Sequence, residues 1–151
     1  MTETEMQSAL IEAARGAATH AYAPYSHFGV GAALLMSDGT IITGANVENA
    51  SYGLSLCAET VAVATASAKG RLAQVVAVAV IGGTIGPNGL RGTNAVMPCG
   101  RCRQILNEAA QLSGVDLPIY CGAAEGGLIV RLLLSELLPY AFGPHNLTKA
   151  T

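Results

Sequence analysis

Three cysteines and one glutamate have the residue types and spacing of a metal-dependent catalytic site. Cys57 precedes Glu59 by two residues, and Cys99 precedes Cys102 by three. Each group falls where the sequence predicts the start of a helix, so Cys99 and Cys102 share a helical face and can bind one ion. Thiolates are favoured at the positive end of a helix dipole and are good zinc ligands.

The number of thiolates distinguishes two kinds of zinc site. Structural sites have four protein ligands, whereas catalytic sites keep one position open for water. The remaining cysteine, Cys121, lies in a predicted strand and is expected to be a small core residue. The histidines lie outside both motifs: His20, His27 and His145. We therefore expect an open position for water, with Glu59 beside that water to accept and pass on its proton.

The elements that must position these residues alternate between helices and strands. Helices are predicted over residues 5–22, 57–69 and 99–112, with a last helical turn over 135–140. Strands are predicted over residues 30–36, 41–45, 74–81, 117–121 and 128–132, with a loop over the glycine-rich residues 82–94. This order predicts a sheet with helices packed on it. With no repeat and no break in composition, residues 1–151 are expected to form a single domain.

The composition limits the classes of protein to consider. Hydrophobic residues make up 51% of the 151 residues and charged residues only 12%, which excludes a disordered chain. The eight lysines and arginines are widely spaced and the net charge is −2, so no nucleic-acid partner is expected. The scarcity of charge also predicts that some apolar surface packs against a partner subunit.

The sequence predicts neither a membrane segment nor a secretion signal. The longest uninterrupted apolar run, residues 75–81, is too short to cross a bilayer. The first residues are acidic, whereas a signal peptide begins with basic residues and an apolar stretch. We therefore expect a cytoplasmic protein with no membrane partner, in which cysteines are more often metal-binding or catalytic than disulfide-bonded.

Beyond the cysteine motifs, the sequence resembles the small, homotetrameric, zinc-dependent cytidine deaminases. Five matching segments occur in the family's order over most of the chain: residues 23–34 (APYSHFGVGAAL), 44–53 (GANVENASYG), 57–59 (CAE), 98–104 (PCGRCRQ) and 137–143 (LLPYAFG). The resemblance implies a three-layer α/β/α sandwich with a mixed sheet of about five strands. It also implies a homotetramer whose active sites are shared between subunits.

The resemblance also implies a role for each matching site residue. Cys57, Cys99 and Cys102 would bind Zn²⁺, and Glu59 would move protons. The residues expected to contact substrate are Asn46 and Glu48 at the ribose hydroxyls, the backbone of Ala58 at the pyrimidine edge, Phe28 in the pocket, and Phe142, which a neighbouring subunit would place over the base.

The implied reaction is hydrolytic deamination of cytidine and deoxycytidine to uridine and deoxyuridine with release of ammonia, in pyrimidine salvage. A zinc-bound hydroxide would attack the amino-bearing ring carbon while Glu59 shuttles protons. Three alternatives remain at this point: a deaminase for another aminopyrimidine nucleoside, such as a blasticidin-type antibiotic, a non-catalytic protein in which zinc only stabilises the fold, and a polynucleotide deaminase. The last is disfavoured by the sparse positive charge.

One position departs from the family pattern. Many members have an arginine after the glutamate, where it offsets thiolate charge, and this chain has Thr60. Zinc with three thiolates has a net charge of about −1, which opposes ionisation of a bound water. The two helix N-termini would offset part of this charge, and Arg101 or Arg103 is hypothesised to supply the rest.

Overall fold

A mixed sheet forms the middle layer of the fold. The computed structural model describes residues 2–147, and its sheet has six strands in the order β2-β1-β3-β5-β6, with β4 paired to the end of β3. Strands β3 and β5 are parallel, and the other pairs are antiparallel. The strands are β1 (Phe28–Met36), β2 (Ile41–Ala45), β3 (Val75–Gly86), β4 (Gly89–Arg91), β5 (Pro118–Ala123) and β6 (Ile129–Leu133).

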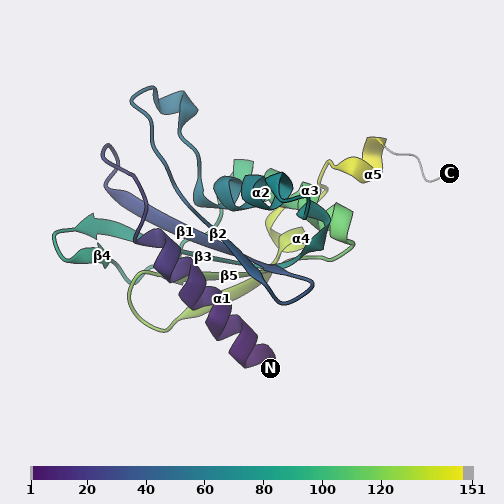
Figure 1. Ribbon diagram of the computed structural model, residues 1–151, viewed down its shortest axis with the longest axis horizontal. Coiled ribbons are helices and arrows are strands. Elements are labelled where there is room, and N and C mark those ends of the chain that lie inside the picture. Colours follow the sequence, from purple (N-terminus) through teal and green to yellow (C-terminus); the bar gives the residue numbers. More distant parts are fainter. Residues whose placement is uncertain (1, 148–151) are drawn as a thin grey trace.

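Helices cover both faces of this sheet, which confirms the three-layer α/β/α arrangement (Figure 1). Alternate residues of β1 face opposite layers: Ala33 and Leu35 pack with α1, whereas Ala32 and Leu34 pack in the core that contains residues of α2 and α3. The helices are α1 (Glu3–Ala18), α2 (Ala58–Ala68), α3 (Gly100–Ser113), α4 (Leu134–Leu137) and α5 (Pro144–Leu147). Within the described residues, no helix has the length and apolar character needed to cross a membrane.

The predicted loop over residues 82–94 is wrong, because β3 continues to Gly86 and pairs with β4. Glycine usually weakens a strand, but here the neighbouring chain leaves no room for a side chain. A Cβ on Gly83 would lie 2.4 Å from the carbonyl oxygen of Arg91. The glycines therefore permit a close backbone approach, and this hairpin adds a sixth strand to the five expected.

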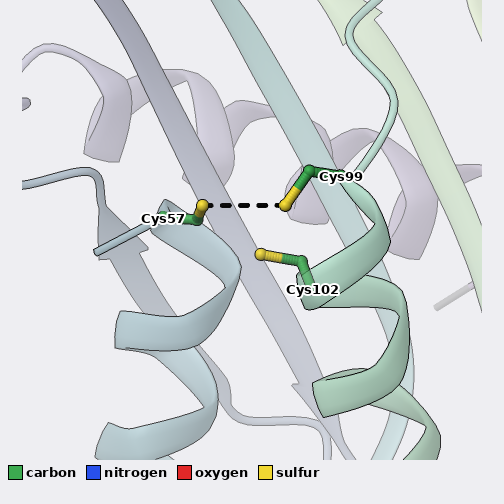
Figure 2. A group of neighbouring side chains, drawn as sticks. All are labelled: Cys57, Cys99 and Cys102. Atoms are coloured by element: carbon green, nitrogen blue, oxygen red, sulfur yellow. Dashed lines mark hydrogen bonds between the residues drawn. The ribbon is translucent and has the colours of Figure 1, made fainter. Parts of the chain in front are cut away.

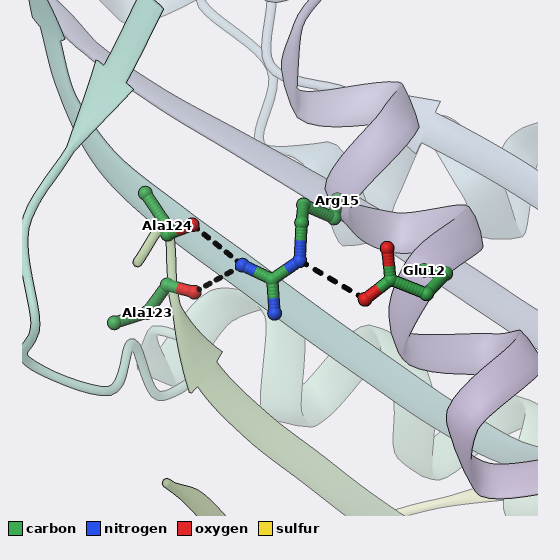
Figure 3. A network of polar contacts seen from close by, with 4 residues as sticks. All are labelled: Glu12, Arg15, Ala123 and Ala124. Atoms are coloured by element: carbon green, nitrogen blue, oxygen red, sulfur yellow. Dashed lines mark hydrogen bonds and ion pairs between the residues drawn. The ribbon is translucent and has the colours of Figure 1, made fainter. Parts of the chain in front are cut away.

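Helix α1 ends at Ala18, four residues before the predicted end. The chain beyond α1 pairs instead with the segment that follows β2: the N–H of Tyr22 donates to the carbonyl oxygen of Asn46, and Tyr22 forms an isolated β-bridge with Val47. Arg15 joins the last turns of α1 to the end of β5 (Figure 3). Its Nη1 donates to the carbonyl oxygens of Ala123 at 2.9 Å and Ala124 at 2.5 Å, and its Nε to Glu12 at 3.2 Å.

Two glycines bring a helix backbone into direct contact with the sheet, one on each face. A Cβ on Gly31 would lie 2.0 Å from the carbonyl oxygen of Ala14 in α1, and a Cβ on Gly44 would lie 2.6 Å from that of Ala58 in α2. Neither helix could lie this close to the sheet if a side chain were present. Gly44 therefore sets the position of the first turn of α2, which carries Glu59.

We predict that Gly44→Ala and Gly31→Ala each destabilise the fold by about 1–3 kcal/mol, since each must push a helix away from the sheet. Only Gly44→Ala should also weaken zinc binding, because Cys57 is the N-cap residue of α2, whereas α1, the helix over Gly31, contains no cysteine. Denaturant unfolding and zinc competition with a chelator measure the two effects. Equal zinc affinities in both variants would show that the close packing of α2 on the sheet does not affect the metal site.

Candidate active site

Two helices begin beside each other, and each has a cysteine as its N-cap residue. Cys57 precedes α2 and Cys99 precedes α3, both with extended backbone angles and without a side-chain capping hydrogen bond. Cys102 lies in the first turn of α3. The three side chains point toward one another from the two helix starts (Figure 2). Their Sγ atoms all lie within 4.8 Å of one another.

The spacing of the sulfur atoms fits zinc. Two thiolates on a tetrahedral zinc at roughly 2.3 Å each lie about 3.8 Å apart, and the Sγ atoms of Cys57 and Cys99 are 3.8 Å apart. Among residues 2–147, no histidine, carboxylate or further cysteine joins this group. Cys121 is fully buried on β5, outside the cluster. The donor set is therefore three thiols, with no fourth protein ligand among the described residues.

The three thiols differ in how readily they lose a proton. Burial raises the pKa of Cys57 and Cys102, and the negative charge of Glu59 raises both further. Burial acts in the same direction on Cys99, but hydrogen bonds from the backbone and side chain of Cys102 and from Cys57 outweigh it and lower the pKa of Cys99. Zinc binding must therefore displace thiol protons, and burial opposes their loss most at Cys57 and Cys102, whose pKa values are raised.

Glu59 lies in the first turn of α2 and is only 3% exposed. Burial raises its pKa, and hydrogen bonds to its own backbone and to Cys102 oppose this only in part. A buried carboxylate with a raised pKa accepts a proton more readily than an exposed one. Its carboxylate is not part of the thiol cluster, so Glu59 is placed beside the metal-binding group and not within it.

A cavity of about 220 Å³ opens at this cluster. It brings together most of the site residues expected from the sequence: Asn46, Glu48, Cys57, Ala58, Glu59 and Cys99. Sequence reasoning did not identify the other lining residues: Val30, Ser55, Leu56, Val96 and Met97. Ser55 and Leu56 lie just before the first cysteine motif, and Val96 and Met97 just before the second. This proximity was the local signal that could have found these four residues.

The two aromatic residues expected in the site lie outside this cavity. Phe28 lines an adjacent cavity of about 240 Å³ that shares Val96 with the first. Phe142 follows α4, has 58% of its surface exposed, and does not line the cavity of its own chain. The described residues therefore leave both rings at the margin of the site or beyond it.

Asn46 and Glu48 are held in place by the backbone of the neighbouring segment. The Oδ1 atom of Asn46 accepts from the N–H of Val30 at 2.8 Å, and its Nδ2 donates to the carbonyl oxygen of Phe28 at 2.9 Å. Glu48 Oε1 accepts from the N–H groups of Tyr25 and Ser26. Hydrogen bonds from Ser26 and Tyr25 lower the pKa of Glu48 and keep it ionised.

The residues considered for offsetting thiolate charge have different environments. Arg103 donates from Nε to the carbonyl oxygen of Pro98 and from Nη1 to that of Leu137, so its hydrogen bonds fix backbone on both sides of α3. Arg101 is exposed. The hydroxyl of Thr60 lies 3.6 Å from Cys102 Sγ and forms a hydrogen bond with it. Sequence reasoning had assigned no contact to Thr60.

We predict that Cys102→Ser lowers zinc affinity by more than the roughly 10–100-fold typical of losing an outer-shell partner, because it removes a ligand. Cys121→Ser is the matched control, since both cysteines are fully buried but Cys121 lies outside the cluster. Chelator competition and metal analysis of the purified proteins measure the difference. A similar loss of zinc in both variants would contradict this ligand assignment.

Comparisons with known proteins identify the family of this chain. Residues 4–115 match the family described as the cytidine and deoxycytidylate deaminase zinc-binding region. A cytidine deaminase from Halalkalibacterium halodurans is 49% identical over 133 residues, which cover 88% of this chain and 91% of the relative. One from Mycobacterium tuberculosis is 41% identical over 135 residues, covering 88% and 86%.

A solved structure gives the same result for the fold. The crystal structure of cytidine deaminase from Burkholderia pseudomallei aligns with a TM-score of 0.76 and 43% identity, covering 94% of this chain and all of the other. Together with the three-thiol cluster, the match to a zinc-binding region identifies zinc as the cofactor. The chain therefore belongs to the cytidine deaminase family of zinc-dependent enzymes.

Proposed function

We propose that this protein catalyses the hydrolytic deamination of cytidine and deoxycytidine to uridine and deoxyuridine, releasing ammonia, as a step of pyrimidine salvage in the cytoplasm. The observation that carries the proposal is a cluster of three thiols, with no fourth protein ligand among residues 2–147, beside a cavity lined by Cys57, Cys99 and the buried Glu59. The relatives named as cytidine deaminases support the choice of substrate.

Glu59 is the residue that moves protons in this proposal. Zinc, when bound by the three cysteines, supplies a Lewis acid and a water of lowered pKa. Glu59 would take one proton of the attacking water at its carboxylate and deliver it to the ring nitrogen. It would then take the second proton from the hydroxyl added to the ring carbon and deliver it to the amino nitrogen, so that the carbon–nitrogen bond breaks with release of ammonia. Its burial supports this role, because burial raises the pKa of the carboxylate and so makes it a better proton acceptor than an exposed glutamate.

The remaining lining groups would hold the nucleoside. The first N–H groups of a helix have no partner within that helix, so the backbone at Ala58, the first residue of α2, is available to the pyrimidine edge. Asn46 Nδ2 uses one of its two hydrogens on Phe28 and can donate the other. Glu48 accepts from the backbone N–H groups of Tyr25 and Ser26 at Oε1, and its carboxylate lines the cavity, where it can accept from a sugar hydroxyl. Phe28 would pack at the margin of the pocket.

We predict that Glu59→Gln retains zinc and lowers turnover by at least about 10²–10⁴-fold, because it removes the proton carrier without changing the side-chain volume. The loss of cytidine absorbance measures turnover, and metal analysis of the same sample measures zinc. A variant that remains active would favour a zinc site that only stabilises the fold. If the unaltered protein turns over cytidine slowly and another aminopyrimidine nucleoside fast, that other nucleoside is the substrate and the proposed one is wrong.

We also propose that the protein is a homotetramer in which subunits complete one another's sites. Residues 47–56 form an arm that extends away from the sheet and carries a short helical turn (Figure 1). Tyr52 and Leu54 in that turn are 73% and 66% exposed, and Phe142 is 58% exposed. Large apolar side chains exposed on a chain with little charge are typical of a subunit interface.

Subunit mixing tests this arrangement. Glu59→Gln should lack turnover and Phe142→Ala should have a raised KM, but a mixed tetramer contains sites with an intact Glu59 from one subunit and an intact Phe142 from another. After denaturation and refolding of an equal mixture, about a quarter of the sites should combine both residues. Unmixed variants taken through the same procedure are the control, and no gain on mixing would mean that each chain builds its site alone.

A further inference from the structure

The segment that carries Phe142 is attached to α3 by side-chain amides on one face of the helix. Gln104 Nε2 and Asn107 Nδ2 donate to the carbonyl oxygen of Phe142, at 2.7 and 3.1 Å. One turn further along, Gln111 Oε1 accepts from the N–H of His145 at 2.8 Å. Residues three and four apart on a helix share a face, so the three amides form a row beneath this segment.

These hydrogen bonds fix the backbone of Phe142 and leave its ring exposed. A carbonyl oxygen has two lone pairs, and here both are used by amide donors from α3. The next residue, Gly143, is buried against the same amides: a Cβ there would lie 2.5 Å from Gln111 Oε1 and 2.7 Å from Asn107 Nδ2. The backbone therefore passes directly over the row, while 58% of the Phe142 surface remains accessible.

The same helix carries the metal-binding cysteines at its start. With a rise of about 1.5 Å per residue, Gln104 lies about 3 Å along the axis from Cys102, and Asn107 about 7.5 Å. Asn107 is one of two buried polar side chains in the described residues, and such a group is costly to bury without a hydrogen bond. The hydrogen bond that Asn107 donates goes to Phe142.

We propose that Gln104 and Asn107 are positioning residues for the reaction: they fix the backbone of Phe142 so that its ring is held in place to close the pocket of a neighbouring copy. This inference rests on the proposed role of Phe142 in a shared site. Neither amide touches substrate. Because the two amides already hold the backbone at Phe142 in place, no conformational entropy is lost in ordering it when substrate binds.

Two substitutions of the same type separate this role from a general effect of added charge. In Gln104→Glu the donor to the Phe142 carbonyl becomes an acceptor, so the hydrogen bond is replaced by repulsion. In Gln111→Glu the side chain still accepts from His145, so the contact is kept. Gln104 is exposed, so its replacement opens no cavity in the core.

We expect Gln104→Glu to raise KM for cytidine roughly tenfold, which is about 1.4 kcal/mol, with little change in kcat, zinc content or oligomeric state. Gln111→Glu should leave KM unchanged. In the Phe142→Ala background, Gln104→Glu should have no further effect, because a residue that acts through Phe142 loses its effect when the ring is gone. If Gln104→Glu instead acted elsewhere in the fold, its effect on KM would add to the effect of Phe142→Ala.

A measurement without substrate follows the ring itself. The chain has five tyrosines but no tryptophan, so Phe142→Trp introduces a single tryptophan that can be excited selectively. Its fluorescence anisotropy should fall when Gln104→Glu is added. If Phe142→Ala leaves KM unchanged, the shared site is wrong and the positioning role is wrong with it. If Phe142→Ala raises KM but Gln104→Glu changes neither KM nor the anisotropy, only the positioning role is overturned.

Discussion

Three sulfur atoms within 4.8 Å of one another concentrate negative charge when they lose their protons, and the surrounding structure must offset it. Two helix N-termini meet at this point, since Cys57 and Cys99 are the N-cap residues of α2 and α3, and each contributes partial positive charge. Thr60 adds a hydrogen bond to Cys102. The helix starts can meet only because Gly44 lets α2 lie against the sheet.

Arg103, one of the two arginines hypothesised to offset thiolate charge, also positions backbone beside the site. The hydrogen bonds of Arg103 go to the carbonyl oxygens of Pro98 and Leu137. Pro98 is the residue before Cys99, so Arg103 fixes the backbone at which the second cysteine motif begins. It also connects that backbone to the end of α4, the element from which the chain continues to Phe142. Arg103 thus fixes both the start of the second cysteine motif and the end of α4, from which the chain continues to Phe142.

The features that depend on local sequence were predictable. A cysteine at a helix start, a glutamate two residues later and a pair spaced by three residues define the positions of Cys57, Glu59, Cys99 and Cys102 without knowledge of the rest of the fold. The predicted cores of the main helices and strands are also present in the structure. These features follow from periodicity and capping, which act over a few residues.

The features that depend on distant parts of the chain were not predictable in this way. The glycines at the end of β3 indicated a loop, because their use for close approach to Arg91 depends on a tertiary contact. The lining residue Val30 comes from a strand far along the chain from either cysteine motif. The hydrogen bonds of Gln104 and Asn107 to Phe142 likewise join residues more than thirty positions apart, and no local pattern indicates such a pair.

The exposed position of Phe142, outside the cavity of its own chain, affects how the protein works as a population of molecules. If the wall of each pocket is completed by another copy, the unit that turns over substrate is the assembly and not the polypeptide. The rate per chain then becomes a function of protein concentration, falling on dilution as copies separate. In a cell, the amount of this protein would set the efficiency of each molecule as well as their number.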